Sequence, residues 1–108
     1  MIPSSDSLDY IGYELELFID ATNWKKYFSE KISPYVRGDV MEVGAGMGIN
    51  TQYLANTPNT ITSWCLVEPD AKLASQIENI TMNVPLPNKT IVNGTIKSIE
   101  DLKFDTII

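Results

Sequence analysis

The feature that most constrains the fold is the glycine-rich segment Gly44-Ala45-Gly46-Met47-Gly48, which directly follows a short apolar run over residues 39–43. Glycine adopts positive φ without steric cost, so this segment can make a tight turn. The apolar run is typical of a buried strand, and Ile49, Tyr53 and Leu54 follow the turn at helical spacing. The segment therefore predicts a strand–turn–helix unit.

Three further segments have the pattern of strands. Residues 61–67 are apolar and rich in residue types that favour strands, residues 90–93 form a short third run, and residues 104–108 begin a fourth. Because the strands alternate with helices, we expect an α/β fold with a parallel sheet and helices on both faces. The sequence ends within the fourth predicted strand, so we expect a truncated sheet with an open edge.

Two helices are predicted besides the one after the glycine segment. The first begins at Asn23 as N-cap and ends at Pro34 and Gly38, and we expect its apolar stripe to be buried on the sheet. This stripe consists of Trp24, Tyr27, Phe28 and Ile32. The second follows residues 61–67, with Pro69 at its first position and Asp70 near its positive end. Its apolar face consists of Ala71, Ala74, Ile77 and Ile80.

Glu68 stands 20 positions beyond Gly48, at the end of the second predicted strand. A carboxylate there can accept two hydrogen bonds from the vicinal hydroxyls of a ribose. A glycine loop without side chains lets a ligand lie directly against the backbone. The plainer alternatives are a bare turn and an acid that only sits near a helix N-terminus. The combination of strand, helix and acid favours a nucleotide or nucleoside site.

The glycine spacing separates two classes of cofactor. Dinucleotide-binding loops have the pattern G-x-G-x-x-G, whereas glycines at 44, 46 and 48 give G-x-G-x-G. The segment over residues 40–48 resembles the first motif of the class I S-adenosylmethionine-dependent methyltransferases, which is an acid, any residue and then G-x-G-x-G. Residues 66–70 resemble the family's second conserved region, residues 91–96 its third strand and adenine-contacting turn, and residues 104–108 the opening of its fourth strand. The resemblance spans roughly residue 23 to the end of the chain.

The resemblance implies a Rossmann-like fold and a binding site for S-adenosylmethionine. Glu42 would help to order the loop and the methionyl end, Glu68 would hold the ribose hydroxyls, and Pro69 would lie near the adenine. The implied cofactor-binding residues are Glu42, Gly44, Ala45, Gly46, Gly48, Glu68, Pro69, Gly94, Thr95 and Ile96. Many relatives carry Asp after the glycine that ends the third strand, where this chain has Thr95, which weakens the adenine assignment.

The resemblance also implies an enzyme, a methyltransferase. Methyl transfer is an in-line displacement in which the protein mainly positions the nucleophile, so no catalytic residue is assigned. Residues 1–22 are expected to form an N-terminal cap segment, and residues 23–108 a partial cofactor-binding domain. Four aromatic residues before the loop could oppose a sulfonium charge. Core packing is favoured for Trp24 and Tyr27, and the two roles are equally weighted for Tyr10 and Tyr13.

Charge and composition narrow the partners. The net charge is −6 and the basic residues are scattered, which argues against nucleic acid and favours a small-molecule methyl acceptor. No apolar run could span a membrane and no export signal is evident, so we expect a cytoplasmic protein. The chain has no His and only Cys65, so no metal site is expected.

Two alternatives remain at this point. One is a fragment of an oxidoreductase that uses NAD(P), or of a nucleotide-sugar enzyme, although the glycine spacing disfavours both. The other is a non-catalytic Rossmann-like interaction module that self-associates through its open sheet edge.

Overall fold

The computed structural model describes residues 21–55 and 60–108. In this part of the chain, four parallel strands form one sheet in the order β3-β2-β1-β4. Their bounds are Gly38–Val43 for β1, Ile61–Val67 for β2, Lys89–Val92 for β3 and Thr106–Ile107 for β4. The order confirms the predicted parallel α/β sheet. The chain steps outward from β1 to β3 and then returns to place β4 on the other side of β1, which creates a topological switch point between β1 and β4.

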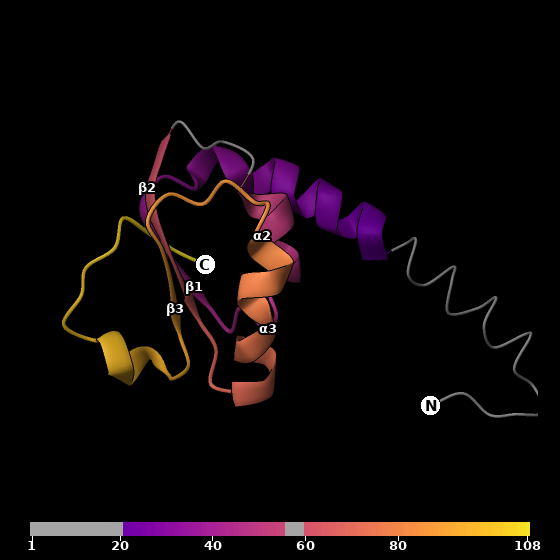
Figure 1. Ribbon diagram of the computed structural model, residues 1–108. Helices are drawn as coiled ribbons and strands as arrows, with labels where there is room; N and C mark the ends of the chain where they lie inside the picture. The colour runs from indigo at the N-terminus through magenta and orange to yellow at the C-terminus, as the bar shows by residue number, and fades with distance from the viewer. Residues whose placement is uncertain (1–20, 56–59) are drawn as a thin grey trace, which may run out of the picture.

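The two faces of the sheet are covered differently. Helices α2 (Ile49–Leu54) and α3 (Ala71–Thr81) lie on one face, and the short 3-10 helix η3 (Ile96–Ile99) lies on the other, as Figure 1 shows. Side chains of β2 alternate between the faces: Trp64 and Leu66 pack with the α-helices, whereas Cys65 and Val67 belong to a second cluster. Trp64 and Leu66 are completely buried, so the first face holds the larger core.

The predicted start of the first helix was wrong. Residues 21 and 22 are already helical, so Asn23 lies inside a helix that continues to residue 32 and is followed by the 3-10 helix η1 (Ser33–Tyr35). Residues 1–20 lie outside the described residues, as do Tyr10 and Tyr13. The division into a cap segment over residues 1–22 and a cofactor domain over residues 23–108 therefore stays a prediction.

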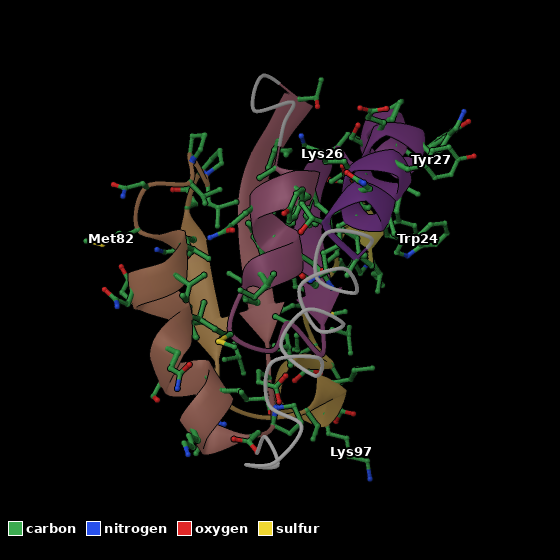
Figure 2. All side chains as sticks on the ribbon, turned by 90° about the vertical axis from the view of Figure 1, so that its right-hand side faces the viewer. Trp24, Lys26, Tyr27, Met82 and Lys97 are labelled. Atoms are coloured by element: carbon green, nitrogen blue, oxygen red, sulfur yellow. The ribbon has the colours of Figure 1, made fainter. Side chains whose placement is uncertain are left out.

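The predicted burial of this helix's apolar stripe was wrong for its three aromatic residues. Trp24 and Tyr27 are 61% and 54% exposed, and Figure 2 shows both side chains pointing away from the body of the protein. They stack on each other at 5.9 Å between ring centroids, and Phe28 is exposed beside them. The inward side carries Ser29, whose hydroxyl donates to a backbone carbonyl, and Ile32, which packs against the core. A satisfied hydroxyl can be buried at little cost, and hydropathy does not show this.

Helix α3 begins two residues after Pro69, so the prediction that this proline opens the helix was wrong. Asp70 is the N-cap, and its Oδ1 accepts hydrogen bonds from the backbone N–H groups of Lys72 and Leu73 at 2.9 and 3.0 Å. A capping carboxylate satisfies N–H groups that have no partner in the helix itself. Ala74 and Ile77 are buried as predicted.

Candidate functional site

The glycine loop leaves β1 and folds over the end of β2. Gly44, Gly46 and Gly48 all have positive φ, at 67°, 62° and 95°, a conformation that costs other residues roughly 1–2 kcal/mol. The backbone N–H groups of Gly44 and Ala45 donate to the carbonyl oxygen of Val67 at 2.8 and 3.1 Å. These bonds bring the loop to the carboxyl end of the neighbouring strand.

The three glycines serve two different purposes. A Cβ added at Gly44 or Gly46 would meet no atom within 4 Å, so the bare backbone borders open space. A Cβ added at Gly48 would lie only 2.7 Å from the methyl group of Thr81. The bare backbone of Gly44 and Gly46, which borders open space, is called the cradle below, and Gly48 allows α2 and α3 to approach closely.

Glu68 lies beside this cradle, at the end of the neighbouring strand, as the sequence predicted. Its side chain is buried, with Oε1 accepting the N–H of Gly46 at 2.8 Å and Oε2 accepting the N–H of Asp70 at 2.9 Å. An ionised carboxylate offers about four lone-pair positions, so each oxygen retains room for a further donor. The two backbone bonds fix the orientation of the carboxylate next to the loop.

The end of β3 supports Glu68 from the other side. The side-chain amide of Asn93 donates to the carbonyl oxygens of Glu68 and Pro69 at 2.9 and 3.1 Å, and the N–H of Gly94 donates to Glu68 O at 3.1 Å. Three of the predicted site residues, Glu68, Pro69 and Gly94, are therefore neighbours. Sequence reasoning missed Asn93, although an amide side chain directly after a strand was a usable signal.

Thr95 and Ile96 lie at the start of η3. Thr95 is the N-cap of η3 in a reciprocal capping box with Ser98, whose hydroxyl accepts the N–H of Thr95 at 3.3 Å. The amide of Thr95 and the acceptor side of its hydroxyl are therefore engaged within η3. Ile96 is 52% exposed, which leaves an apolar surface near the end of β3.

Glu42 is buried beneath the loop, with only 4% of its surface exposed. Its Oε1 accepts the hydroxyl of Thr51 at 2.6 Å and the indole N–H of Trp64 at 3.1 Å. Burial raises the pKa of the Glu42 carboxyl, and the two hydrogen bonds oppose that shift. The network ties β1 to α2 and β2, so it anchors both sides of the glycine loop. Sequence reasoning missed both donors, although a buried indole N–H requires an acceptor.

Metal ligands, the cysteine and membrane-spanning helices were also considered in the described residues. Within residues 21–55 and 60–108, no group of three His, Cys, Asp or Glu side chains could hold a metal ion. Cys65 is buried, and burial raises the pKa of its thiol, which makes it a poor nucleophile. In the same residues, no helix is both long and apolar enough to cross a membrane.

Comparison with known proteins identifies the fold. No family model and no curated protein matches the chain. Among solved structures it is similar to a conserved hypothetical protein from Streptococcus pyogenes, with 20% identity, a TM-score of 0.58, and coverage of 77% of this chain and 54% of that one.

Two further solved structures are S-adenosylmethionine-dependent methyltransferases. The first is from Leishmania major (15% identity, TM-score 0.54, 99% of this chain and 42% of that one). The other is from Clostridium acetobutylicum (22% identity, TM-score 0.51, 93% and 42%). The chain thus has the class I S-adenosylmethionine-dependent methyltransferase fold. It spans about half the length, or less, of these structures.

Proposed function

We propose that this chain is the cofactor-binding part of an S-adenosylmethionine-dependent methyltransferase that acts on a small molecule. One observation carries the proposal. The N–H of Gly46 donates to Glu68 Oε1 at 2.8 Å, beside the open space that borders Gly44 and Gly46. This arrangement joins a bare backbone surface to an oriented carboxylate at the carboxyl ends of two adjacent parallel strands, where such folds bind nucleotides.

The residues present fit the parts of such a cofactor. Glu68 would accept the two ribose hydroxyls, because each of its oxygens has capacity for one more donor. The backbone of Gly44 and Gly46 would lie along the ribose and methionyl parts, and the exposed side chain of Ile96 would cover one side of the adenine. S-adenosylmethionine would supply a methyl group activated on a sulfonium, so this chain has to bind and orient rather than attack.

The small-molecule acceptor is supported by charge. The chain carries 14 acidic and 8 basic residues, and a surface that follows phosphate backbones would require clustered cations. The methyltransferase fold itself does not distinguish among acceptors.

Isothermal titration calorimetry on the 108-residue chain tests the proposal. We expect heat of binding for S-adenosylmethionine and for S-adenosylhomocysteine, weaker binding for adenosine, and none for NAD. Adenosine is the informative fragment, because it carries the ribose hydroxyls without the methionyl group.

Two outcomes would reject the proposal. Binding of NAD without either S-adenosyl ligand would favour a dinucleotide enzyme. A stable oligomer in light scattering that is indifferent to all of these ligands would favour an interaction module that associates through its sheet edge.

A further inference from the structure

The C-terminal turn of α3 lies directly against the last residue of the glycine loop. At the position of a Cβ on Gly48, the nearest atoms are Cγ2 of Thr81 at 2.7 Å, Cγ2 of Ile80 at 3.7 Å and Cγ2 of Ile77 at 3.9 Å. Gln52 of α2 also donates from its side-chain amide to the carbonyl oxygen of Ile80 at 3.1 Å. The helix after β2 therefore supports the loop that leaves β1.

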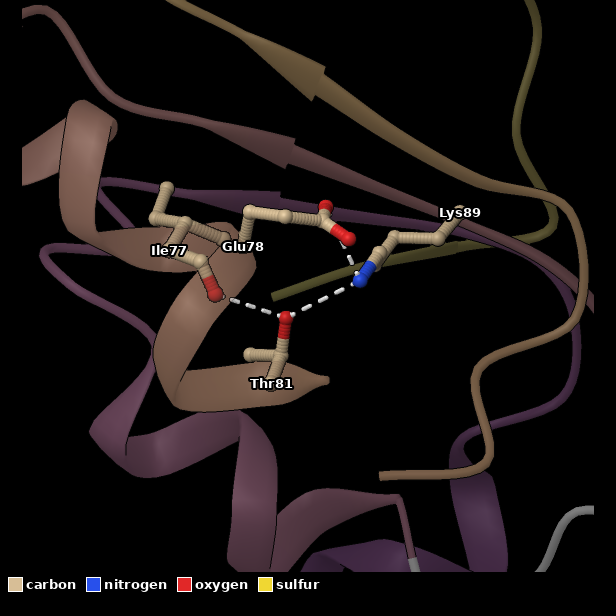
Figure 3. Close-up of polar contacts among 4 residues, drawn as sticks. All are labelled: Ile77, Glu78, Thr81 and Lys89. Carbon is tan, nitrogen blue, oxygen red and sulfur yellow. Dashed lines mark hydrogen bonds and ion pairs between the residues drawn. The ribbon is translucent and has the colours of Figure 1, made fainter. Parts of the chain in front are cut away.

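The side chain of Thr81 is held in one orientation by its hydroxyl group. The hydroxyl donates to the carbonyl oxygen of Ile77 at 2.8 Å and accepts from Nζ of Lys89 at 3.3 Å, as Figure 3 shows. Lys89 in turn pairs with Glu78 at 3.1 Å. In helices a threonine populates two χ1 rotamers, so bonds that hold the hydroxyl also decide where its methyl group lies. Thr81 is completely buried, and its methyl group faces Gly48.

We propose that Thr81 is a positioning residue for the cofactor loop. The inference rests on the proposed function, because the loop it positions is the one that would bind S-adenosylmethionine. Thr81 contacts the last glycine of the loop, and Gly44 and Gly46 lie only a few residues before it. Through Gly48, the methyl group of Thr81 sets the backbone path of the whole cradle. Lys89 and Glu78 contribute only through Thr81, and since Glu78 is 69% exposed its contribution is small.

A double-mutant cycle tests this contact by calorimetry with S-adenosylhomocysteine. Gly48→Ala alone places a methyl group against Thr81 and should weaken binding by more than about ten-fold, and Thr81→Ser alone by about three-fold. Thr81→Ser keeps the hydroxyl and removes the clashing methyl group. In the double variant we therefore expect binding about five-fold tighter than in Gly48→Ala alone, with full recovery prevented by the positive φ at residue 48.

The control is Thr90→Ser on β3, an exposed position that pairs with Cys65 in the middle of β2, and it should leave the affinity unchanged. Circular dichroism must show every variant folded at the temperature of the titration, so that a general loss of stability is excluded. The inference is wrong if the double variant binds more weakly than Gly48→Ala by the same factor that Thr81→Ser shows alone.

Failure of the inference and failure of the proposed function give different results. If the unmodified chain binds neither S-adenosyl ligand, the proposed function and the loop-positioning role both fail. If it binds and the two substitutions act independently, only the role of Thr81 fails. Urea unfolding of the unmodified chain, the two single variants and the double variant gives a second measure of the coupling. We expect the double variant to lose less stability than the sum of the two single losses, and a loss equal to that sum would contradict the contact.

Discussion

The two ends of the sheet use glycine in opposite ways. At the amino end, Gly38 has a φ of 69°, and the position of its missing Cβ is filled by the carboxylate of Asp105. At the carboxyl end, Gly44 and Gly46 have nearly the same φ, but nothing lies within 4 Å of their missing Cβ atoms. The same residue type with nearly the same positive φ therefore serves internal packing at one end and leaves open space beside the backbone at the other.

The carboxylates at the two ends of the sheet also differ in their hydrogen bonds and surroundings. At the amino end, Asp39 accepts the hydroxyls of Thr62 and Ser63 at 2.8 and 2.7 Å, and Asp105 accepts the N–H of Asp39 at 2.8 Å. A hollow of about 410 Å³ at this end is lined by Arg37, Gly38, Thr60 and Asp105. One oxygen of Asp105 thus holds the backbone of β1 at Asp39, whereas both oxygens of Glu68 at the other end accept N–H groups, one of them from the cradle. A hollow alone does not mark a binding site.

The largest expected effect separates the two kinds of glycine by stability. Gly38→Ala must displace Asp105 and should lower the free energy of unfolding by about 2–4 kcal/mol. Gly46→Ala has space and should cost only about 1 kcal/mol from its positive φ. Urea denaturation followed by circular dichroism measures both, and equal losses would remove the distinction between the two ends. The affinity for S-adenosylhomocysteine should follow the opposite order, unchanged in folded Gly38→Ala and reduced in Gly46→Ala.

The next effect compares two carboxylates that accept backbone N–H groups, one at each end of the sheet. Glu68→Ala should weaken binding of S-adenosylhomocysteine by about 1.5–3 kcal/mol, the range for hydrogen bonds to a charged group. Asp105→Ala removes an equivalent acceptor at the amino end and should leave the affinity of the folded protein unchanged. Calorimetry on the two variants decides the matter. Unaltered affinity in Glu68→Ala would exclude this residue from the site.

A smaller effect is the pH dependence of stability that arises from Glu42 on β1. Burial raises the pKa of Glu42 above its usual 4.5, so the folded protein retains a proton that the unfolded chain loses. The contribution of Glu42 to stability is therefore complete below pH 4.5 and falls as the pH rises toward its folded pKa. Glu42→Gln keeps an acceptor for Thr51 and Trp64 and should reduce this decline. Urea titrations between pH 4 and 7 measure it, and an identical pH profile would contradict it.

The smallest effect lies at the exposed end of β1. Hydrogen bonds from Ser63, which has the larger effect, and from Thr62 lower the pKa of Asp39 below its usual 3.8. The contribution of Asp39 to the free energy of unfolding is therefore lost only as the pH falls toward that lowered pKa. Ser63→Ala should move the pKa of Asp39 back toward 3.8 without changing ligand affinity. NMR titration of the Asp39 side chain detects the shift, and an unmoved pKa would show that Ser63 is not its main cause.

Much of the fold follows from local patterns. The predicted strand over residues 61–67 coincides with β2, and the predicted glycine turn lies between β1 and α2. Such features depend on neighbouring residues: apolar runs form buried strands, and glycines permit positive φ. The proximity of Glu68 to the loop also followed, because adjacent parallel strands bring their carboxyl ends together.

The largest error concerned which face of the first helix packs against the body of the protein. The helix over residues 21–32 presents Ile32 to the body, as predicted, but with Ser29 beside it, and it leaves Trp24 and Tyr27 exposed although their spacing predicted burial. The local hydrogen bond from the Ser29 hydroxyl to Lys26 O makes the polar side chain acceptable inside. Hydrophobic periodicity does not register such bonds.

The sequence by itself determined the strand–loop–helix unit, the glycine spacing and the acid on the next strand, because each depends on residues close together in the chain. Only the tertiary structure decided which glycines border open space, because the atoms that fill or vacate a Cβ position come from elsewhere: Asp105 at Gly38, Thr81 at Gly48, and none at Gly44 or Gly46. Steric contacts form between atoms that are close in space, and residues far apart in the sequence supply many of them, so the sequence order alone does not show them.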